Sequence, residues 1–332
     1  MKPIQVTLVT GFLGAGKTTL LNRISKSETG LRIAIIENEF GDLGVDGSLL
    51  NSACETVFEL NDGCVCCTVR EDLVEVFREL LVRSDEFDHV IVETTGLAEP
   101  APVLRVFEMP VLRESFELDG VVTVVDAGHI EKSLSEISTC AEQIAYADLV
   151  ILNKVDGLSP SALESVEGQL RGINPVASIV RAEHARVDVQ SLLTLGGRPE
   201  GVEASDESVH EHHSHHHHAI QSVFAAVIGE INVAALDLWL GKLIRSRDVD
   251  LLRMKGILAV PGDPRRFVFN GVRDVVDIRP ERPWGDQPRG CRIVFIGRGL
   301  DTEELQAGLT ECMAEAIGAP DGNTSKSSKR IE

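Results

Sequence analysis

GFLGAGKT, residues 11–18, is the stretch that decides the fold of this chain. The apolar run before it, residues 4–10, predicts a buried strand, and the residues after it predict a helix that opens at Lys17. Glycines in such a turn let backbone N–H groups surround a phosphate that a Cβ would keep away. Because strand, glycine turn and helix occur in the required order, we interpret the stretch as a phosphate-binding P-loop, not a chance glycine-rich turn.

The residue types of this loop fit a nucleotide triphosphate. Lys17 can reach the β- and γ-phosphates, and the hydroxyl of Thr18 can ligate Mg²⁺. The helix that follows adds its positive amino-terminal end. The residues that we expect around the nucleotide are Gly11, Phe12, Leu13, Gly14, Ala15, Gly16, Lys17, Thr18 and Thr19.

Apolar runs alternate with amphipathic stretches around this loop. Strands are predicted at residues 31–36, 89–92, 120–125 and 149–152, and helices at 17–25, 71–83 and 160–171. This alternation predicts an α/β domain with a doubly wound, mostly parallel sheet. Functional loops then belong at the carboxyl ends of the strands.

A polar segment divides the chain. Residues 196–218 combine Gly, acidic and His residues and predict an acidic, His-rich linker between a first domain at 1–195 and a second at 219–317. The second domain is expected to be a smaller α+β unit. Its strands are predicted at 220–227, 257–260, 266–269 and 292–296, and its helices at 233–245 and from Asp301 to about Ile317. The tail, 318–332, is expected to be disordered.

Length and composition restrict the class of protein. The 332 residues suffice for two domains, and 43% hydrophobic with 25% charged residues is ordinary globular composition. A net charge of −20 repels phosphate backbones, so we expect no nucleic-acid partner. No apolar run reaches the ~18 residues of a membrane span, and the start leaves no room for a signal peptide. We therefore expect a cytoplasmic protein without a membrane partner.

A second nucleotide signal follows the strand at 149–152. It is Asn153-Lys154-Val155-Asp156. A carboxylate at Asp156 can accept N1–H and N2–H₂ of guanine, whereas adenine offers no matching pair of donors. Asn153 would brace the loop and reach N7, and the stem of Lys154 would cover the face of the base. The tetrapeptide after a strand and behind a P-loop predicts GTP; the alternative is a turn with a capping Asp.

Two more strand ends carry polar residues. Glu93 ends the strand at 89–92, where a P-loop enzyme needs a carboxylate behind Mg²⁺, and Gly96 can present its N–H to the γ-phosphate. We therefore assign catalytic roles to Lys17, Thr18, Glu93 and Gly96, although Glu93 could also be a solvated residue. The segment 37–42, with Glu37 and Glu39, suits a metal-sensitive switch loop about as well as an acidic surface loop.

Three of the seven cysteines crowd into Cys64, Cys66 and Cys67. Thiolates at a strand-to-helix corner bind zinc, and a helix amino terminus favours the thiolate form. Redox-active or buried cysteines are the alternative. The loop is too tight to close a tetrahedron comfortably, so a fourth ligand is expected from Glu37, Glu39, the linker or a partner. An incomplete shell suits transfer better than permanent structural binding.

The linker contains seven histidines in nine residues. Other residues interrupt the run and it lies inside the chain, so we do not interpret it as a purification tag. We interpret them as a weak, multi-site collector of metal ions. They are His210, His212, His213, His215, His216, His217 and His218.

Together these motifs resemble the CobW-type GTPases, in the branch of zinc-regulated GTPase metalloprotein activators. GFLGAGKTT, IENEFG, GCVCC, VETTGLAEP and NKVD occur in the order of the family, and residues 282–285 and 293–297 resemble its second domain, so the likeness spans residues 4–312. The resemblance implies a P-loop NTPase domain with a CobW C-terminal-like domain. It also places the start of the helix after the cysteines near the nucleotide, namely Cys67, Thr68, Val69, Arg70 and Glu71.

The function that this resemblance implies is a GTP-hydrolysing metallochaperone that delivers zinc, or cobalt or another divalent ion, to a client metalloprotein. A metal store or sensor without a client, delivery related to cobalamin, a P-loop kinase or ATPase, and a regulatory GTPase with structural cysteines are the alternatives. No glutamine occurs in residues 94–100 to position the attacking water, and Arg70 is a weak internal candidate. The oligomeric state stays open, with a metal-dependent homodimer as one alternative.

Overall fold

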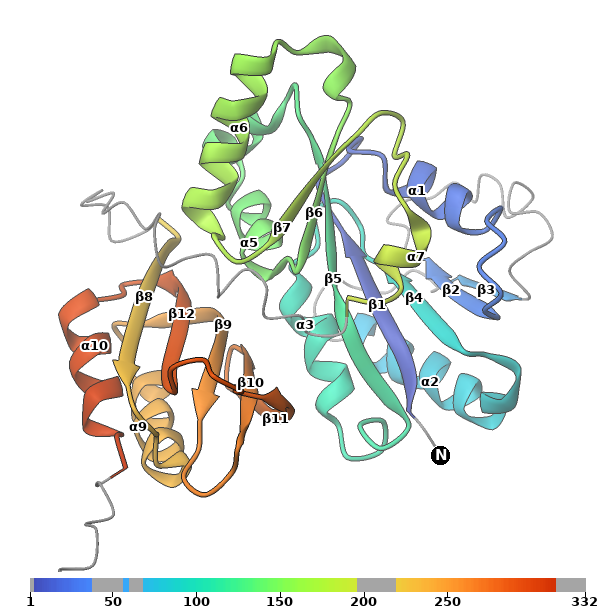
Figure 1. Ribbon diagram of the computed structural model, residues 1–332. Coiled ribbons are helices and arrows are strands. Elements are labelled where there is room, and N and C mark those ends of the chain that lie inside the picture. The colour runs from blue at the N-terminus through green and yellow to red at the C-terminus, as the bar shows by residue number, and fades with distance from the viewer. Residues whose placement is uncertain (1–2, 38–55, 60–67, 196–218, 315–332) are drawn as a thin grey trace, which may run out of the picture.

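The computed structural model describes residues 3–37, 56–59, 68–195 and 219–314. Within them the chain forms two sheets (Figure 1). The first has seven strands in the order β3-β2-β4-β1-β5-β6-β7, and all of its pairings are parallel. Its strands are β1 Ile4–Thr10, β2 Ile33–Glu37, β3 Thr56–Glu59, β4 His89–Glu93, β5 Phe116–Asp126, β6 Leu149–Asn153 and β7 Ser178–Ala182.

Helices connect these strands and cover both faces of the sheet. They are α1 Lys17–Ile24, α2 Thr68–Val82, α3 Pro100–Leu104, α4 Ile130–Glu136, α5 Ser138–Tyr146, α6 Pro160–Ile173 and α7 Val189–Leu192, with short 3₁₀ turns at Ser84–Glu86, Arg105–Glu108 and Val155–Gly157. The doubly wound parallel sheet that the sequence predicts is confirmed.

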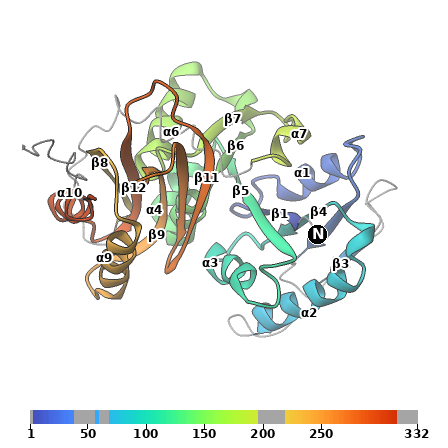
Figure 2. The same cartoon turned by 60° about the horizontal axis from the view of Figure 1, so that its bottom comes forward.

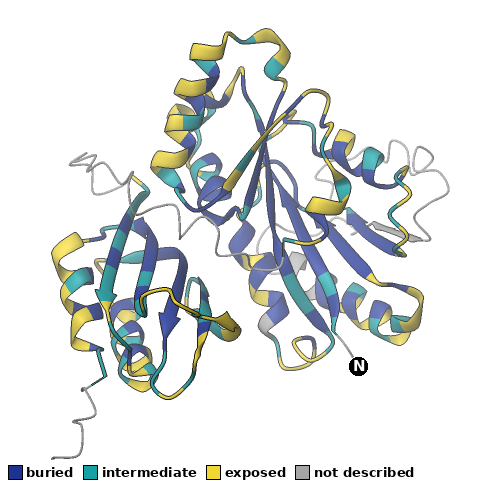
Figure 3. Cartoon of the chain, in the orientation of Figure 1, coloured by how far each residue is buried: buried dark blue, intermediate teal, exposed yellow. Residues whose placement is uncertain are grey.

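The alternation of side chains along β1 shows why both faces are covered. Val6 and Leu8 pack with Phe77 of α2 in one cluster, whereas Val9 packs with Leu20 of α1 in another. A strand that is apolar on both sides needs a layer of helices on each side. Figure 3 shows the result, with the central strands buried and the outer surfaces of the helices exposed.

The second sheet is antiparallel, with the order β11-β10-β9-β12-β8. Its strands are β8 Gln221–Ile228, β9 Asp250–Ala259, β10 Arg265–Val272, β11 Val275–Pro283 and β12 Gly290–Arg298, and its helices are α9 Val233–Arg245 and α10 Thr302–Glu311. The predicted smaller α+β domain is therefore confirmed in its class.

This second sheet is also buried on both faces. In β12, Ile293 and Phe295 pack with the helix residues Leu240 and Leu309, while Val294 and Ile296 join the apolar cluster of the first domain. The period of two along a strand sends neighbouring side chains to opposite faces. One face thus carries α9 and α10, and the other lies against the parallel domain (Figure 2).

Several predicted bounds are wrong. The last helix ends at Glu311, not near Ile317, because Met313 pairs with Ile231 in a β-bridge and the Ala314 N–H donates to Glu230 O at 2.9 Å. The strand predicted at 257–260 begins at Asp250, since Arg253 and Lys255 interrupt its apolar pattern. Both are nevertheless buried, at 4% exposure each.

The predicted linker and tail lie outside the described residues, and the domain bounds 1–195 and 219–317 stay predictions. In the part of the chain that the structure describes, no helix combines the length and the apolar character that crossing a membrane requires.

Candidate functional site

The P-loop lies at the carboxyl edge of the parallel sheet, between β1 and α1. Gly11 and Gly16 have φ values of 137° and 113°, in the region that favours glycine. A Cβ on Gly11 would run into the backbone of Val124, and one on Gly16 would run into the side-chain amide of Asn153. The loop therefore presents bare backbone where a phosphate would bind.

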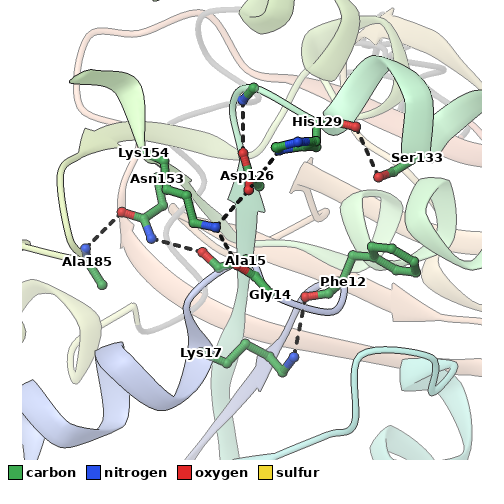
Figure 4. Close-up of polar contacts among 11 residues, drawn as sticks. Phe12, Gly14, Ala15, Lys17, Asp126, His129, Ser133, Asn153, Lys154 and Ala185 are labelled. Carbon is green, nitrogen blue, oxygen red and sulfur yellow. Dashed lines mark hydrogen bonds and ion pairs between the residues drawn. The ribbon is translucent and has the colours of Figure 1, made fainter. Parts of the chain in front are cut away.

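Lys17 is buried beside this loop, and its ammonium group contacts two backbone carbonyls. Its Nζ donates to Gly11 O at 2.9 Å. It also lies 3.5 Å from Phe12 O (Figure 4). Burial lowers the pKa of Lys17, and the nearby Glu93 carboxylate partly opposes this shift. An ammonium group held by two uncharged carbonyls gains a stronger partner when a phosphate arrives, because the phosphate oxygen carries a charge of its own.

The loop after β4 lies directly on the P-loop. Thr94 Oγ1 donates to Thr10 Oγ1 at 2.9 Å, and a Cβ on Gly96 would lie 2.6 Å from Leu13 N. The hydroxyl oxygen of Thr95 is buried and has no hydrogen-bond partner among the described residues. A buried polar atom of this kind is satisfied once a phosphate oxygen or a metal-bound water binds beside it. The residues at this edge thus fit a nucleotide triphosphate with its cation.

Asn153 ties the second nucleotide motif to the P-loop. Its buried side chain donates from Nδ2 to Ala15 O at 2.9 Å and accepts at Oδ1 from the Ala185 N–H at 2.8 Å. Lys154, at φ 62°, donates from Nζ to Gly14 O at 2.7 Å. Asp156 is exposed in the 3₁₀ turn that follows. The structure thus brings residues 14–16 and 153–156 together, as the motifs predict.

Asp126, at the end of β5, is a site residue that the sequence analysis missed. It accepts from Lys154 Nζ at 2.8 Å, and His129 Nδ1 lies 3.2 Å from it (Figure 4). Burial opposes its ionisation, but hydrogen bonds from Lys154, His129 and the Gly128 N–H outweigh burial and lower the pKa of Asp126. Its position one residue past the predicted strand 120–125 was the signal that could have identified it.

Ala185 is a second missed residue. It follows β7, has a φ of 53°, and donates the backbone hydrogen bond that holds Asn153. No residue type in this loop identifies the role of Ala185. The only signal in the sequence is its position shortly after the end of a strand. The loop after β7 therefore completes the carboxyl edge next to residues 153–156.

The candidate metal ligands are only partly described. Glu37 and Glu93 end the neighbouring strands β2 and β4 and are half-buried. Thr68, Val69, Arg70 and Glu71 form the first turn of α2. The ligands that lie outside the described residues are Glu39, Cys64, Cys66, Cys67 and the histidines at 210, 212, 213 and 215–218. Among the described residues, no three His, Cys, Asp or Glu side chains gather closely enough to hold a metal ion.

Three other cysteines are inert core residues. Cys140, Cys291 and Cys312 are free and buried. Burial raises the pKa of Cys140 and that of Cys291 to about 11. A thiol with such a pKa stays protonated at neutral pH and is a poor metal ligand. Cys140 and Cys291 are therefore poorer candidates for a metal site than Cys64, Cys66 and Cys67.

Comparison with known proteins gives two matches to family models. Residues 5–181 match the nucleotide-binding domain of the CobW/HypB/UreG family, and residues 220–313 match the C-terminal domain of the cobalamin synthesis protein CobW. The first match contains every nucleotide motif described above, and the second contains the antiparallel sheet.

Individual relatives cover nearly the whole chain. A protein named zinc chaperone CobW, from Pseudomonas aeruginosa, is 39% identical over 94% of this chain and 92% of its own length. The zinc-regulated GTPase metalloprotein activator 1 of Schizosaccharomyces pombe is 38% identical over 90% of this chain and 84% of its own. The crystal structure of the Zn(II)-bound YjiA GTPase from Escherichia coli superposes with a TM-score of 0.71 at 31% identity, covering 95% of this chain and 100% of that one.

Proposed function

We propose, from the premise that this chain belongs to the CobW/HypB/UreG family, that it is a GTPase that carries zinc to a client metalloprotein. Relatives named zinc chaperone and zinc-regulated GTPase metalloprotein activator support both halves of this proposal. One observation carries the GTPase half: the side chain of Asn153 bonds the P-loop on one side and the Ala185 loop on the other.

That bracing gives the guanine base a defined place. With Lys154 held between Gly14 O and Asp126, its stem covers one face of the base, and the exposed carboxylate of Asp156 accepts from N1–H and N2–H₂. An adenine would leave that carboxylate facing an acceptor, so the pocket discriminates by unmatched polar groups. GTP is therefore the substrate that this edge favours over ATP.

Hydrolysis uses groups that surround the γ-phosphate. Lys17 transfers its hydrogen bond from a carbonyl to the phosphate, and the Gly96 N–H stabilises charge that develops on the γ-oxygens. Thr18 would hold Mg²⁺, with Glu93 behind it, and the ion supplies further neutralisation of the phosphates. Since residues 94–100 contain no glutamine to orient water, we expect slow turnover by the isolated chain and stimulation by the client.

Zinc is the cargo in this scheme. Cys64, Cys66 and Cys67 supply thiolates, and a fourth ligand comes from Glu37, Glu39, the linker histidines or the client. Glu37 ends the strand next to the one that carries Glu93, so ligand and nucleotide groups share one sheet edge. If GTP tightens zinc binding, zinc tightens GTP binding by the same factor, typically roughly 5–150-fold. Hydrolysis then releases zinc.

The test measures zinc affinity by competition with a chelator, in the presence of a non-hydrolysable GTP analogue and in the presence of GDP. We expect tighter binding with the analogue and loss of this site in Cys66→Ser. The matched control is Cys312→Ser, which changes a buried thiol of raised pKa and should bind zinc as the parent does. Equal affinities in the two nucleotide states contradict a chaperone driven by GTP.

Two further measurements separate the alternatives. Binding of GTP without competition from ATP supports a GTPase, whereas equal binding indicates a P-loop kinase or ATPase. Capture of one defined metalloenzyme by the GTP–zinc state supports delivery, and nucleotide-dependent zinc binding without any client indicates storage or sensing.

A further inference from the structure

Helix α5 contacts the loop after β4 through Gln143. The side chain of Gln143 is 1% exposed, and its Nε2 donates to Gly96 O at 3.1 Å and to Ala98 O at 3.2 Å. The backbone of Gln143 is held in turn, because Thr123 Oγ1 donates to its carbonyl at 2.7 Å. Both N–H bonds of the amide thus point at the loop whose Gly96 N–H serves the γ-phosphate in the proposed function.

The preceding residue of α5 contacts the second domain. Glu142 is 7% exposed, and its Oε1 lies 2.6 Å from Nη2 of Arg298, at the end of β12. Arg298 also pairs with Asp250 at 2.7 Å. Neighbours in a helix point about 100° apart, which lets α5 present one side chain to the loop and the next to the other domain. Figure 1 shows α5 on the side of the parallel domain nearest the second domain.

Glu142 depends on Arg298. Its second oxygen, Oε2, is buried and has no hydrogen-bond partner among the described residues. Moving α5 away from Arg298 would break the ion pair of a buried carboxylate and leave it with only the more distant charge of Arg273, which is unfavourable. A shift of α5 is therefore expected to carry Arg298 and β12 with it.

The carboxyl end of α5 is tied to Asn174, the residue that follows α6. Nδ2 of Asn174 donates to Ile144 O at 2.8 Å and to Ala147 O at 2.9 Å, so it satisfies carbonyls at the end of α5. Beside the helix lies a cavity of about 380 Å³, whose lining includes Leu13 of the P-loop and Gln143. A close-packed interior resists displacement, whereas open space beside α5 removes packing that would oppose a shift of this helix.

We propose that Gln143 is a positioning residue for the Gly96–Ala98 backbone, and that α5 couples this loop to the C-terminal domain through Glu142 and Arg298. The inference rests on the proposed function, since it assumes that the loop responds to the γ-phosphate of GTP. Nucleotide state then changes the C-terminal domain, and by reciprocity a change at Arg298 alters the binding of GTP relative to GDP.

The test uses the full chain and two readouts. The first is hydrogen exchange of β12 amides with a non-hydrolysable GTP analogue and with GDP; the second is kcat and KM for GTP. We expect the two nucleotides to change β12 exchange by about fivefold in the parent chain, within the usual range of allosteric coupling. In R298Q this difference disappears. In Q143L kcat falls about tenfold while KM stays within about twofold, because the loop and not the base pocket is disturbed.

The matched control is R279Q. Arg279 pairs with Glu117 across the same two domains, but at the start of β5, away from α5 and the loop. R279Q should keep the nucleotide-dependent exchange of β12. If R298Q does not fold, R298K takes its place; it keeps the charge but not the two-sided contact, and should weaken the difference in the same direction.

The outcomes separate this inference from the function on which it rests. A parent chain that turns over no GTP overturns the proposed function. A parent chain that hydrolyses GTP, but whose β12 exchange ignores the nucleotide or responds equally in R298Q and R279Q, overturns the coupling alone. A rise in KM of Q143L well beyond twofold would show that nucleotide binding is disturbed as well, and a loss of kcat that matches a loss of folded protein in urea unfolding would show a structural role; either result would overturn the positioning role.

Discussion

Two buried cationic groups of this protein have different kinds of partner. Lys17, at the nucleotide edge, donates to the backbone carbonyl of Gly11. Arg253, between the domains, lies 2.6 Å from the carboxylate of Asp148, which also pairs with Lys255 and accepts from the Val121 N–H at 2.8 Å. We call the second group, Asp148, Arg253 and Lys255, the interdomain ion cluster.

The difference separates a charge kept for a ligand from a charge used for structure. A carbonyl holds an ammonium group weakly enough that a phosphate can replace it, whereas a buried carboxylate cannot be replaced without a large penalty. Burial opposes ionisation of Asp148, but Arg253 and Lys255 outweigh burial and lower its pKa. The first region should therefore govern turnover and the second stability, and the predictions below test that separation.

The largest effect is expected in the interdomain ion cluster. Asp148→Asn leaves two buried cations without their carboxylate, which costs about 3–5 kcal/mol in the free energy of unfolding. Denaturation with urea measures the change. Asp263→Asn is the control, because its pair with Arg265 is exposed to water and its loss should change the free energy of unfolding far less. A loss below about 1 kcal/mol in Asp148→Asn would mean that the cluster is not structural.

At the nucleotide edge, Lys17→Ala should lower kcat/KM for GTP by about 10²–10³, the usual effect of removing one donor to developing charge. The free energy of unfolding should change by less than it does in Asp148→Asn, since the acceptors that Lys17→Ala leaves behind are uncharged carbonyls. Steady-state phosphate release measures the first quantity and urea unfolding the second. Lys242→Ala, on the exposed face of α9, should change neither; large destabilisation by Lys17→Ala would break the comparison.

Acid should weaken the opposite, amino edge of the parallel sheet. His89 begins β4, with its Nε2 2.8 Å from Thr7 Oγ1, and burial lowers its pKa from 6.5 to about 4. The unfolded chain therefore binds the proton first, and stability present above pH 6.5 is lost as the pH falls toward 4. Between pH 7 and 5 the loss is about 2 kcal/mol.

Urea unfolding at the two pH values checks this contribution. His89→Gln should remove it, whereas His129→Gln, at a side chain that is 75% exposed, should keep it. A pH dependence that survives in His89→Gln would assign the acid sensitivity to another group.

The smallest effect is expected at Asp126, a carboxylate at the nucleotide edge that pairs with the exposed Lys154. Asp126→Asn weakens the hold on Lys154 and should raise KM for GTP about two- to fivefold with kcat unchanged, as loss of one partly exposed contact implies. His129→Gln is the control, since it leaves the bond between Lys154 and Asp126. A drop in kcat would place Asp126 nearer the phosphates than the base.

Prediction from the sequence succeeded where the residues of a motif are consecutive in the chain. Residues 11–18 and 153–156 each form a turn directly after a strand, so their spacing alone placed them at one edge, and the structure joins them through Asn153. It failed at Asp126, Ala185 and Gln143, whose roles depend on neighbours from other elements. The predicted zinc ligands Cys64, Cys66 and Cys67 stay predictions.

The sequence by itself determined the parallel sheet, the α+β class of the second unit and the nucleotide motifs, because apolar periodicity and glycine turns act over a few residues. Only the tertiary structure decided what α5 contacts and which charges are buried between the domains. The pairs involved, Gln143 with Gly96, Asp148 with Arg253 and Glu142 with Arg298, are 47, 105 and 156 residues apart. No local pattern encodes such pairs, since they form only when separately folded elements pack together and exclude water from between them.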